Sequence, residues 1–201
     1  MEENEFMNII TYAKSMRTFA STIEAIAKGI QRYSGFECVG IRIKNTFGDY
    51  PYFKYLGFKD SFVSTENSLC SLDKDGNTKK DADGNPILEC ICGNIIQERF
   101  DPKQPFFTEG GSFWTNSTTE SGNFITEKNI KMDLRMICNK EGYESVGLFP
   151  LKKNNIILGL LQLNDSKKDM FSRENVVAFE AFAREIGSVV FYAIVIKGEK
   201  V

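Results

Sequence analysis

The stretch Glu144–Asp165, ESVGLFPLKKNNIILGLLQLND, consists of two apolar runs separated by a Lys-Lys-Asn-Asn turn. Each run has the length of a strand, and the Asn residues suit the turn of a β-hairpin. The runs cover Glu144–Leu151 and Ile156–Leu163, and a long apolar segment of helical periodicity follows them. A hairpin followed by such a helix predicts an antiparallel sheet with helices packed against it.

The segment after the hairpin predicts one long helix. Ser172 is the expected N-cap, and Phe171 and Val176 have the spacing of a hydrophobic staple. Phe182 and Ile194 broaden the apolar stripe of this helix beyond one face. We therefore expect the sheet to cover one side and the same helix of a second subunit to cover the other, which predicts a homodimer through the terminal helices.

The first third of the chain predicts helix and then strands. Residues 1–20 form a helix or linker, and a second helix begins with a capping box at Ser21 and ends at Gly35. Cys38–Lys44 alternates like a half-buried strand, and Tyr52–Phe58 follows as a second strand. The whole order predicts an α+β fold: a sheet of about six antiparallel strands, with the terminal helices on one face and a long loop region on the other.

Periodicity fades in the long excursion over residues 59–129, although its many Phe residues and Trp114 predict that it packs on the domain. Asp-Gly steps near Gly76 and Gly84 predict surface turns, because the glycines stand at the wrong position for an EF-hand calcium loop. A short helix is expected near Glu127–Asn139, and residues 1–201 read as a single domain.

Composition excludes several classes of function. The 201 residues are 42% hydrophobic and carry a net charge of −2, which favours neither nucleic acid nor a membrane surface as partner. There is no histidine, which removes imidazole bases, Ser–His and Cys–His pairs and mixed Cys/His zinc sites. The longest apolar run, Ile186–Ile196, is far shorter than the roughly 20 residues of a membrane-spanning helix. With an acidic N-terminus, this predicts a cytoplasmic protein.

Four cysteines, Cys70, Cys90, Cys92 and Cys138, lie in or beside the excursion. Four thiolates suit a zinc ion or an iron–sulfur cluster, and on a strand Cys90 and Cys92 would face the same way. The spacing also allows a redox thiol pair, or small buried residues that only pack. We keep all three interpretations, with these four cysteines as candidate metal ligands.

An aromatic and hydroxyl-rich run predicts the wall of a ligand pocket. Apolar walls with a few polar groups are typical of small-molecule sites, and the alternative is a satellite core that anchors the loop. The candidate ligand-binding residues are Phe106, Phe107, Thr108, Ser112, Trp114, Asn116 and Tyr143.

Over residues 20–195 the sequence resembles a GAF domain, in particular the GAF modules of PAS/GAF sensor histidine kinases. The matching strings are Leu88–Gly93 (LECICG), Phe106–Thr108 (FFT), Gly111–Asn116 (GSFWTN), Gly142–Ser145 (GYES) and Gly159–Asp165 (GLLQLND). The resemblance implies the fold expected above and a non-catalytic sensory module in signal transduction. Such a module would sense a small molecule, a metal or a redox state, with a histidine kinase or PAS domain as partner.

Known branches of the family differ in their ligands. Cyclic-nucleotide binders carry an Asn-Lys pair, a Phe and an Asp-Glu pair, whereas this chain has Asn164-Asp165, Phe171 and Glu174-Asn175. Bilin binders attach the chromophore through a Cys that a His usually follows, and haem binders typically use His, so the absence of histidine disfavours both, although a Cys ligand to haem is chemically possible. Some small GAF proteins reduce methionine sulfoxide with cysteines, so a thiol-dependent enzyme of this type is one alternative. A structural dimerisation module without a ligand is the other.

Overall fold

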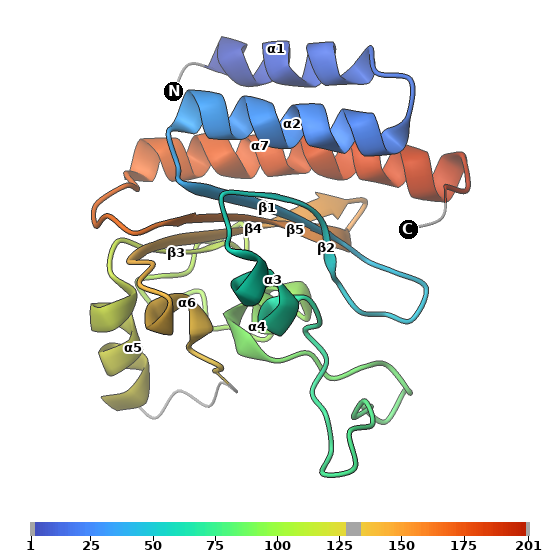
Figure 1. Ribbon diagram of the computed structural model, residues 1–201. Coiled ribbons are helices and arrows are strands. Elements are labelled where there is room, and N and C mark those ends of the chain that lie inside the picture. The colour runs from blue at the N-terminus through green and yellow to red at the C-terminus, as the bar shows by residue number, and fades with distance from the viewer. Residues whose placement is uncertain (1–2, 128–133, 200–201) are drawn as a thin grey trace.

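The computed structural model describes residues 3–127 and 134–199 of the chain. Five antiparallel strands form one sheet in the order β2-β1-β5-β4-β3, and helices cover both faces (Figure 1). The strands are β1 (Cys38–Ile43), β2 (Tyr52–Leu56), β3 (Phe113–Thr115), β4 (Ser145–Lys153) and β5 (Ile156–Asp165). The α+β class and the hairpin are confirmed, with five strands in place of about six.

Three long helices cover one face of the sheet, which we call the helical face (Figure 1). They are α1 (Glu3–Lys14), α2 (Phe19–Ser34) and α7 (Arg173–Phe191), and a π-helical turn, η1 (Tyr192–Ile196), extends α7. Ser172 caps α7 as expected, closing its box with Asn175. The cap of α2 is Thr18, with Ser21 as its reciprocal partner, so this helix begins earlier than predicted.

The excursion covers the opposite face of the sheet, which we call the distal face (Figure 1). It is more regular than its sequence predicts, because it contains β3 and several short helices. These are α3 (Asp60–Glu66), α4 (Cys90–Ile96) and α5 (Thr118–Glu127), with α6 (Ile137–Lys140) after the excursion. The predicted helix near Glu127–Asn139 is wrong over residues 134–136, which are not helical, and its part over 128–133 lies outside the described residues.

Strict alternation along β1 separates the two faces. Val39, Ile41 and Ile43 belong to the core under the helices, whereas Cys38 belongs to the distal core and Arg42 lies on that same side. The sheet therefore places an entirely apolar core on one side and the polar site described below on the other.

The wide apolar arc of α7 is covered within the chain. Phe6 of α1 stacks on Phe182 at 4.4 Å between ring centroids, and it also meets Phe179. Within the chain, α1 thus covers part of the apolar arc of α7, and the homodimer through the terminal helices stays a prediction. Within residues 3–127 and 134–199, no helix is both long and apolar enough to span a bilayer.

Candidate functional site

Arg42 lies at the centre of the distal face with no exposed surface. Its guanidinium donates to three backbone carbonyls, those of Tyr50 at 3.0 Å, Glu66 at 2.7 Å and Asn67 at 3.1 Å. The ring of Tyr52 covers it at 3.6 Å from the guanidinium carbon. The carbonyls of Glu66 and Asn67 belong to the C-terminal end of α3, where unpaired helix carbonyls favour a cation.

A chain of amide and hydroxyl groups continues from Tyr52 across β5. The Tyr52 hydroxyl donates to Gln162 Oε1 at 2.8 Å, and Gln162 Nε2 donates to Asn164 Oδ1 at 3.1 Å. Gln162 Nε2 also lies 3.9 Å from Cys138 Sγ. Because Gln162 and Asn164 are two residues apart on a strand, both point to the distal face.

Three buried polar atoms of this network have no hydrogen-bond partner among the described residues. They are Arg42 Nε, Glu66 Oε1 and Asn164 Nδ2. Glu66 is only 2% exposed, and its unpaired Oε1 lies 3.6 Å from the guanidinium of Arg135. Buried polar groups are normally satisfied, so two donors without a hydrogen-bond partner and a carboxylate oxygen held only by this longer ion pair mark the network as a candidate site.

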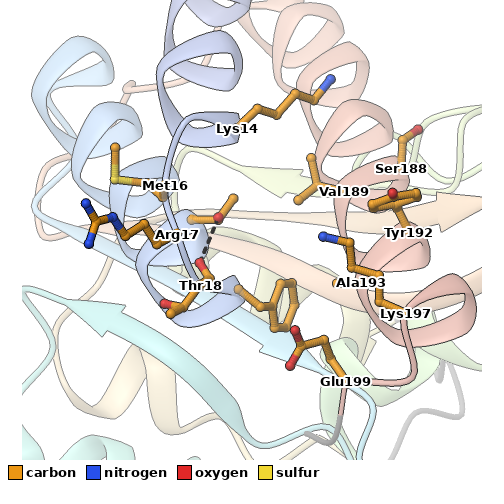
Figure 2. Close-up of a pocket in the computed structure, with 12 residues that line it drawn as sticks. Lys14, Met16, Arg17, Thr18, Ser188, Val189, Tyr192, Ala193, Lys197 and Glu199 are labelled. Carbon is orange, nitrogen blue, oxygen red and sulfur yellow. Dashed lines mark hydrogen bonds between the residues drawn. The ribbon is translucent and has the colours of Figure 1, made fainter.

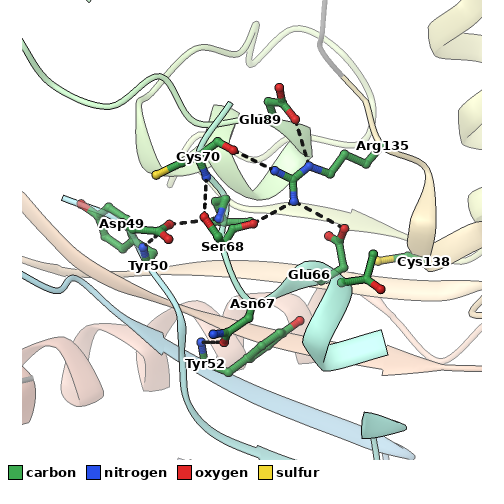
Figure 3. A network of polar contacts seen from close by, with 12 residues as sticks. Asp49, Tyr50, Tyr52, Glu66, Asn67, Ser68, Cys70, Glu89, Arg135 and Cys138 are labelled. Atoms are coloured by element: carbon green, nitrogen blue, oxygen red, sulfur yellow. Dashed lines mark hydrogen bonds and ion pairs between the residues drawn. The ribbon is translucent and has the colours of Figure 1, made fainter. Parts of the chain in front are cut away.

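Arg135 lies in the segment that precedes α6 and contacts several residues that are distant from it in sequence, as Figure 3 shows. Its guanidinium contacts Glu89 Oε2 at 3.0 Å and the carbonyls of Ser68 and Cys70 at 2.8 and 3.2 Å. A longer contact joins Arg135 to Glu66. These contacts hold the segment around Arg135 against residues 66–70 and Glu89, and we call this part of the distal face the cover.

A small cavity of about 40 Å³ lies under this cover. Cys90, Cys92 and Cys138 line it, together with mainly apolar side chains. Burial raises the pKa of Cys138 to about 12 and raises those of Cys90 and Cys92 as well. At neutral pH these thiols are therefore protonated and weakly nucleophilic.

No family model and no curated protein matches the sequence. Among solved structures, a GAF domain from a phosphoenolpyruvate-protein phosphotransferase of Coxiella burnetii is similar with TM-score 0.67 and 10% identity, over 98% of this chain and 96% of that chain. The corresponding domain from Acinetobacter gives TM-score 0.63 and 11% identity, over 96% and 94%.

This chain has the GAF fold. A free methionine-R-sulfoxide reductase from Neisseria meningitidis, in complex with its substrate, is also similar, with TM-score 0.59 and 12% identity, over 92% of this chain and 85% of that chain. The solved structures that are similar to this chain therefore include an enzyme as well as GAF domains of phosphotransferases, and the shared fold does not distinguish an enzyme from a non-catalytic module.

The GAF fold brings together three of the four candidate cysteines. Cys90 and Cys92 lie in the helix α4, not on a strand, so the expected same-side arrangement is wrong. Cys70 forms an isolated antiparallel β-bridge with Leu88 through its backbone, and it is not among the residues that line the cavity. Within the described residues, no group of three or more acidic or cysteine side chains is arranged to hold a metal ion, and the metal site stays a prediction.

The predicted ligand-binding run is divided between different environments. Phe106 and Phe107 belong to the distal core, as does Tyr143, whose hydroxyl lies 3.5 Å from Cys38 Sγ. Trp114 packs against the core of the helical face, because it alternates with Phe113 along β3.

Two polar members of that run, Asn116 and Thr108, form hydrogen bonds with other parts of the fold. Asn116 bonds both the N–H and the carbonyl of Phe171 at 2.8 Å, which fixes the start of α7. Thr108 donates to Glu180 of α7, and the hydroxyl of Ser112 is buried without a partner among the described residues. The seven predicted ligand-binding residues thus do not line one common cavity.

Sequence reasoning missed Arg42, Glu66, Gln162 and Asn164. The signal was present in the strands: Arg42 alternates with Ile41 and Ile43, and a polar residue of that parity normally faces solvent. The excursion buries this face, which no local pattern reveals.

A surface groove of about 450 Å³ lies elsewhere, beside the C-terminal end of α7 (Figure 2). Lys14, Arg17 and Lys197 surround an apolar floor that includes Val189 and Tyr192. None of the predicted site residues lines it, and the buried polar network on the distal face remains the candidate site of the GAF fold.

Proposed function

We propose that this chain is a non-catalytic sensory GAF module of signal transduction, whose signal is a small polar molecule bound on the distal face. The ligand would accept hydrogen bonds from Arg42 Nε and Asn164 Nδ2 and would donate to Glu66 Oε1. These three buried atoms carry the proposal, because none has a hydrogen-bond partner among the described residues and Glu66 Oε1 has only its ion pair with Arg135. A molecule with both a carbonyl or carboxylate oxygen and an N–H or O–H group fits them.

Binding requires the cover to open. The cavity of about 40 Å³ has room for little more than a water molecule, whose share of liquid volume is about 30 Å³, and Arg42, Glu66 and Asn164 are not among the residues that line it. Opening would release the bonds of Arg135 to Glu89 and to the carbonyls of Ser68 and Cys70. The ligand would then replace Arg135 at Glu66 Oε1, so binding shifts the chain from a closed to an occupied arrangement.

The sheet offers a route from the site to the terminal helices. Arg42 faces the ligand, whereas its neighbours Ile41 and Ile43 belong to the core under α2 and α7. A shift of β1 at Arg42 would therefore change the packing of those helices, through which a histidine kinase or PAS domain would receive the signal.

A thermal-shift screen of amino acids, carboxylic acids and nucleobases tests the proposal. We expect one compound class to raise the melting temperature of the wild type and to bind Asn164→Ala about tenfold more weakly, because one hydrogen bond is lost. Lys74→Ala, an exposed change in a distant turn, is the matched control and should bind like the wild type.

Equal binding by the wild type and Asn164→Ala would contradict a site at the distal network. A metal assay of the same anaerobically purified sample tests the metal interpretation. Stoichiometric zinc or iron would make the cysteines ligands and redirect the sensory function to the metal.

The second candidate is a thiol-dependent reductase of methionine sulfoxide. It is favoured by the three cysteines that line one cavity, while their raised pKa values count against it. In that reaction two thiols are oxidised to a disulfide, and the sulfoxide is reduced to the sulfide with release of water. Turnover of free methionine-R-sulfoxide with dithiothreitol, abolished in Cys138→Ser, would establish the enzyme and overturn the non-catalytic proposal.

A further inference from the structure

The guanidinium of Arg135 lies among four oxygen atoms of other residues, which we call the oxygen cradle (Figure 3). Its Nε donates to Glu89 Oε2 at 3.0 Å, and its Nη1 and Nη2 donate to the carbonyls of Ser68 and Cys70 at 2.8 and 3.2 Å. Its Nη1 also lies 3.6 Å from Glu66 Oε1. Each guanidinium nitrogen thus has an acceptor of its own, an arrangement that suits a planar fork of donors better than a single ammonium group.

The frame of the cradle is fixed by bonds that do not involve Arg135. The Leu69 N–H donates to Asp49 Oδ1 at 3.0 Å, and the Leu69 carbonyl accepts from the Glu89 N–H at 2.8 Å. These bonds hold the segment that supplies the two carbonyls of the cradle next to the residue that supplies one of its carboxylates. Acceptors fixed in this way lose little conformational freedom when a cation binds.

Glu66 is the part of the cradle that Arg135 satisfies least. The side chain of Glu66 is 3% exposed, and its Oε1 has no hydrogen-bond partner among the described residues. The separation of 3.6 Å from Arg135 is longer than a hydrogen bond. Burial of a carboxylate oxygen without a hydrogen bond costs free energy, which a cation closer to Glu66 would remove.

Two further cations act on these carboxylates without filling the cradle. Arg42 acts on Glu66, and the exposed Lys79 acts on Glu89, but neither lies within ion-pair distance of them. Among the described residues, Arg135 is therefore the one cation that pairs with both carboxylates. Its withdrawal leaves both without an ion pair, so another cation has to take its place.

The closed position of Arg135 is accompanied by backbone strain on both sides of its ion pair with Glu89. Met136, which follows Arg135, has φ 55°, and Cys90, which follows Glu89, has φ 63°. Residues other than glycine adopt this left-handed conformation only at a cost in free energy. The strain offsets part of the stabilisation that Arg135 provides, which makes its replacement easier.

We propose that the oxygen cradle is a guanidinium site, which Arg135 occupies in the closed chain and which the guanidinium group of a small molecule occupies after displacing it. This inference rests on the proposed function, because it names the cationic group of the ligand bound on the distal face. The ligand pairs with Glu66 and Glu89 and donates to the carbonyls of Ser68 and Cys70. Arg135 is a competitor within the chain, which keeps the site closed at low ligand concentration.

Arg135→Ala empties the cradle and allows a direct test with methylguanidinium chloride. We expect this salt to raise the melting temperature of the variant by about 3 to 5 °C at about ten times its dissociation constant, and to leave the wild type unchanged. Urea has the planar shape without the charge, and methylammonium has the charge without the fork, so neither should have this effect. Arg32→Ala, which removes an exposed arginine from α2, is the matched control and should gain no binding.

Further variants locate the bound cation. Arg135→Ala/Glu66→Gln should bind methylguanidinium about tenfold more weakly than Arg135→Ala, because the buried charge is gone. Arg135→Gln fills more of the space, and it repeats the test if Arg135→Ala does not fold. A methylguanidinium response no larger than that to urea in the folded variant would overturn the guanidinium site.

Calorimetric titration with arginine tests the class of the ligand in the full chain. We expect Arg135→Ala to bind arginine about tenfold more tightly than the wild type, because the competitor is gone. Citrulline, which has a neutral urea group in place of the guanidinium, should bind both proteins about tenfold more weakly than arginine. A structural role for Arg135 predicts the opposite, weaker binding in the variant. Equal affinity for arginine and citrulline, or no binding of arginine by either protein, would overturn this ligand class.

Asn164→Ala separates this inference from the proposed function. Methylguanidinium has no acceptor for Asn164 Nδ2, so Arg135→Ala/Asn164→Ala should bind it like Arg135→Ala, whereas Asn164→Ala should bind arginine about tenfold more weakly than the wild type. Arginine binding that Asn164→Ala leaves unchanged would refute the ligand position of the proposed function and keep the guanidinium site. Loss of the methylguanidinium response, with another ligand still dependent on Asn164, would refute the guanidinium site alone.

Discussion

The two faces of the sheet use the same strands for different purposes. The core under α1, α2 and α7 consists of apolar side chains alone, with Phe179 and Ile186 fully buried. The distal face buries Arg42, Gln162 and Asn164 at 0 to 1% exposure among aromatic rings and thiols. Buried polar groups cost free energy unless they form hydrogen bonds, so we expect the distal face to stabilise the fold less than the apolar core of the helical face does.

This division agrees with the way function is placed in folded proteins. A close-packed core tolerates few changes, whereas a buried polar group without a hydrogen-bond partner has a cost that a bound ligand would remove. Three of the four buried unpartnered atoms in the described residues lie on the distal face, and the fourth lies at Ser112 beside the edge of the sheet. The comparison predicts that changes on the helical face affect stability first and changes on the distal face affect accessibility and binding.

The largest expected effect is that of Phe179→Ala on the helical face. Phe179 has no exposed surface and meets four other phenylalanine rings, Phe6, Phe36, Phe149 and Phe171. The free energy of unfolding should fall by about 4 kcal/mol through lost burial and the cavity left behind. Urea unfolding followed by circular dichroism measures it.

Val177→Ala is the control on the same helix. Val177 is 63% exposed, so its change should alter the free energy of unfolding by less than about 0.5 kcal/mol. Similar losses for both variants would mean that α7 does not bury the face described here.

Arg42→Met should lower the free energy of unfolding by about 3 kcal/mol, which is less than Phe179→Ala, although it removes a fully buried charge. Methionine fills much of the space but leaves the carbonyls of Tyr50, Glu66 and Asn67 without their donor. Arg42→Lys keeps the charge but loses the planar guanidinium, so its free energy of unfolding should lie between those of the wild type and Arg42→Met. An Arg42→Met protein as stable as the wild type in urea would show that the network is not needed for folding.

Alkaline pH should destabilise the distal face through its buried thiols. Burial raises the pKa of Cys38 to about 11, against about 8.5 for an unperturbed thiol. The folded state therefore keeps this proton to higher pH than the unfolded state does. The contribution of the protonated Cys38 thiol to the free energy of unfolding is full below about pH 8.5 and is lost as pH rises towards 11. Between about pH 8.5 and pH 11, a thiol with such a raised pKa lowers the free energy of unfolding by up to about 1.4 kcal/mol per pH unit.

Urea unfolding between about pH 8 and pH 11 measures the slope, with Cys38→Ala as the comparison. Burial also raises the pKa values of Tyr52 and Tyr143, so the wild type should lose stability more steeply than any single group predicts. Only the part that belongs to Cys38 should disappear in the variant. Parallel slopes in both proteins would exclude Cys38 as a contributor.

The helical face could be predicted from sequence because its information is local. Ser172 caps α7 as its position indicates, and the hairpin of β4 and β5 follows its apolar runs. The distal face could not, because its helices are short and are held by contacts between distant residues. Arg135, for example, bonds Ser68, Cys70 and Glu89, and no periodicity connects those positions.

The candidate site shows the same limit at the level of single residues. The cysteines drew attention by their chemistry, yet the strand expected for Cys90 and Cys92 is a helix. Arg42 alternates like a solvent-facing residue, and only the closure of the excursion over β1 makes it buried. Chemistry-bearing residue types are visible in a sequence, whereas burial by a long excursion is not.

The smallest effect on stability, and the clearest on accessibility, is expected for Arg135→Ala. Arg135 is partly exposed, so the loss in global unfolding free energy should stay near about 1 kcal/mol. Its bonds close the cover over Cys90, Cys92 and Cys138, and local opening needs only these bonds to break. Alkylation of these three thiols in the native protein, followed residue by residue by mass spectrometry, should accelerate about tenfold. Arg32→Ala removes an exposed arginine from the helical face and should leave the alkylation rates unchanged. Equal acceleration in both variants would mean that the thiols react through global unfolding, and that Arg135 does not hold the distal face closed.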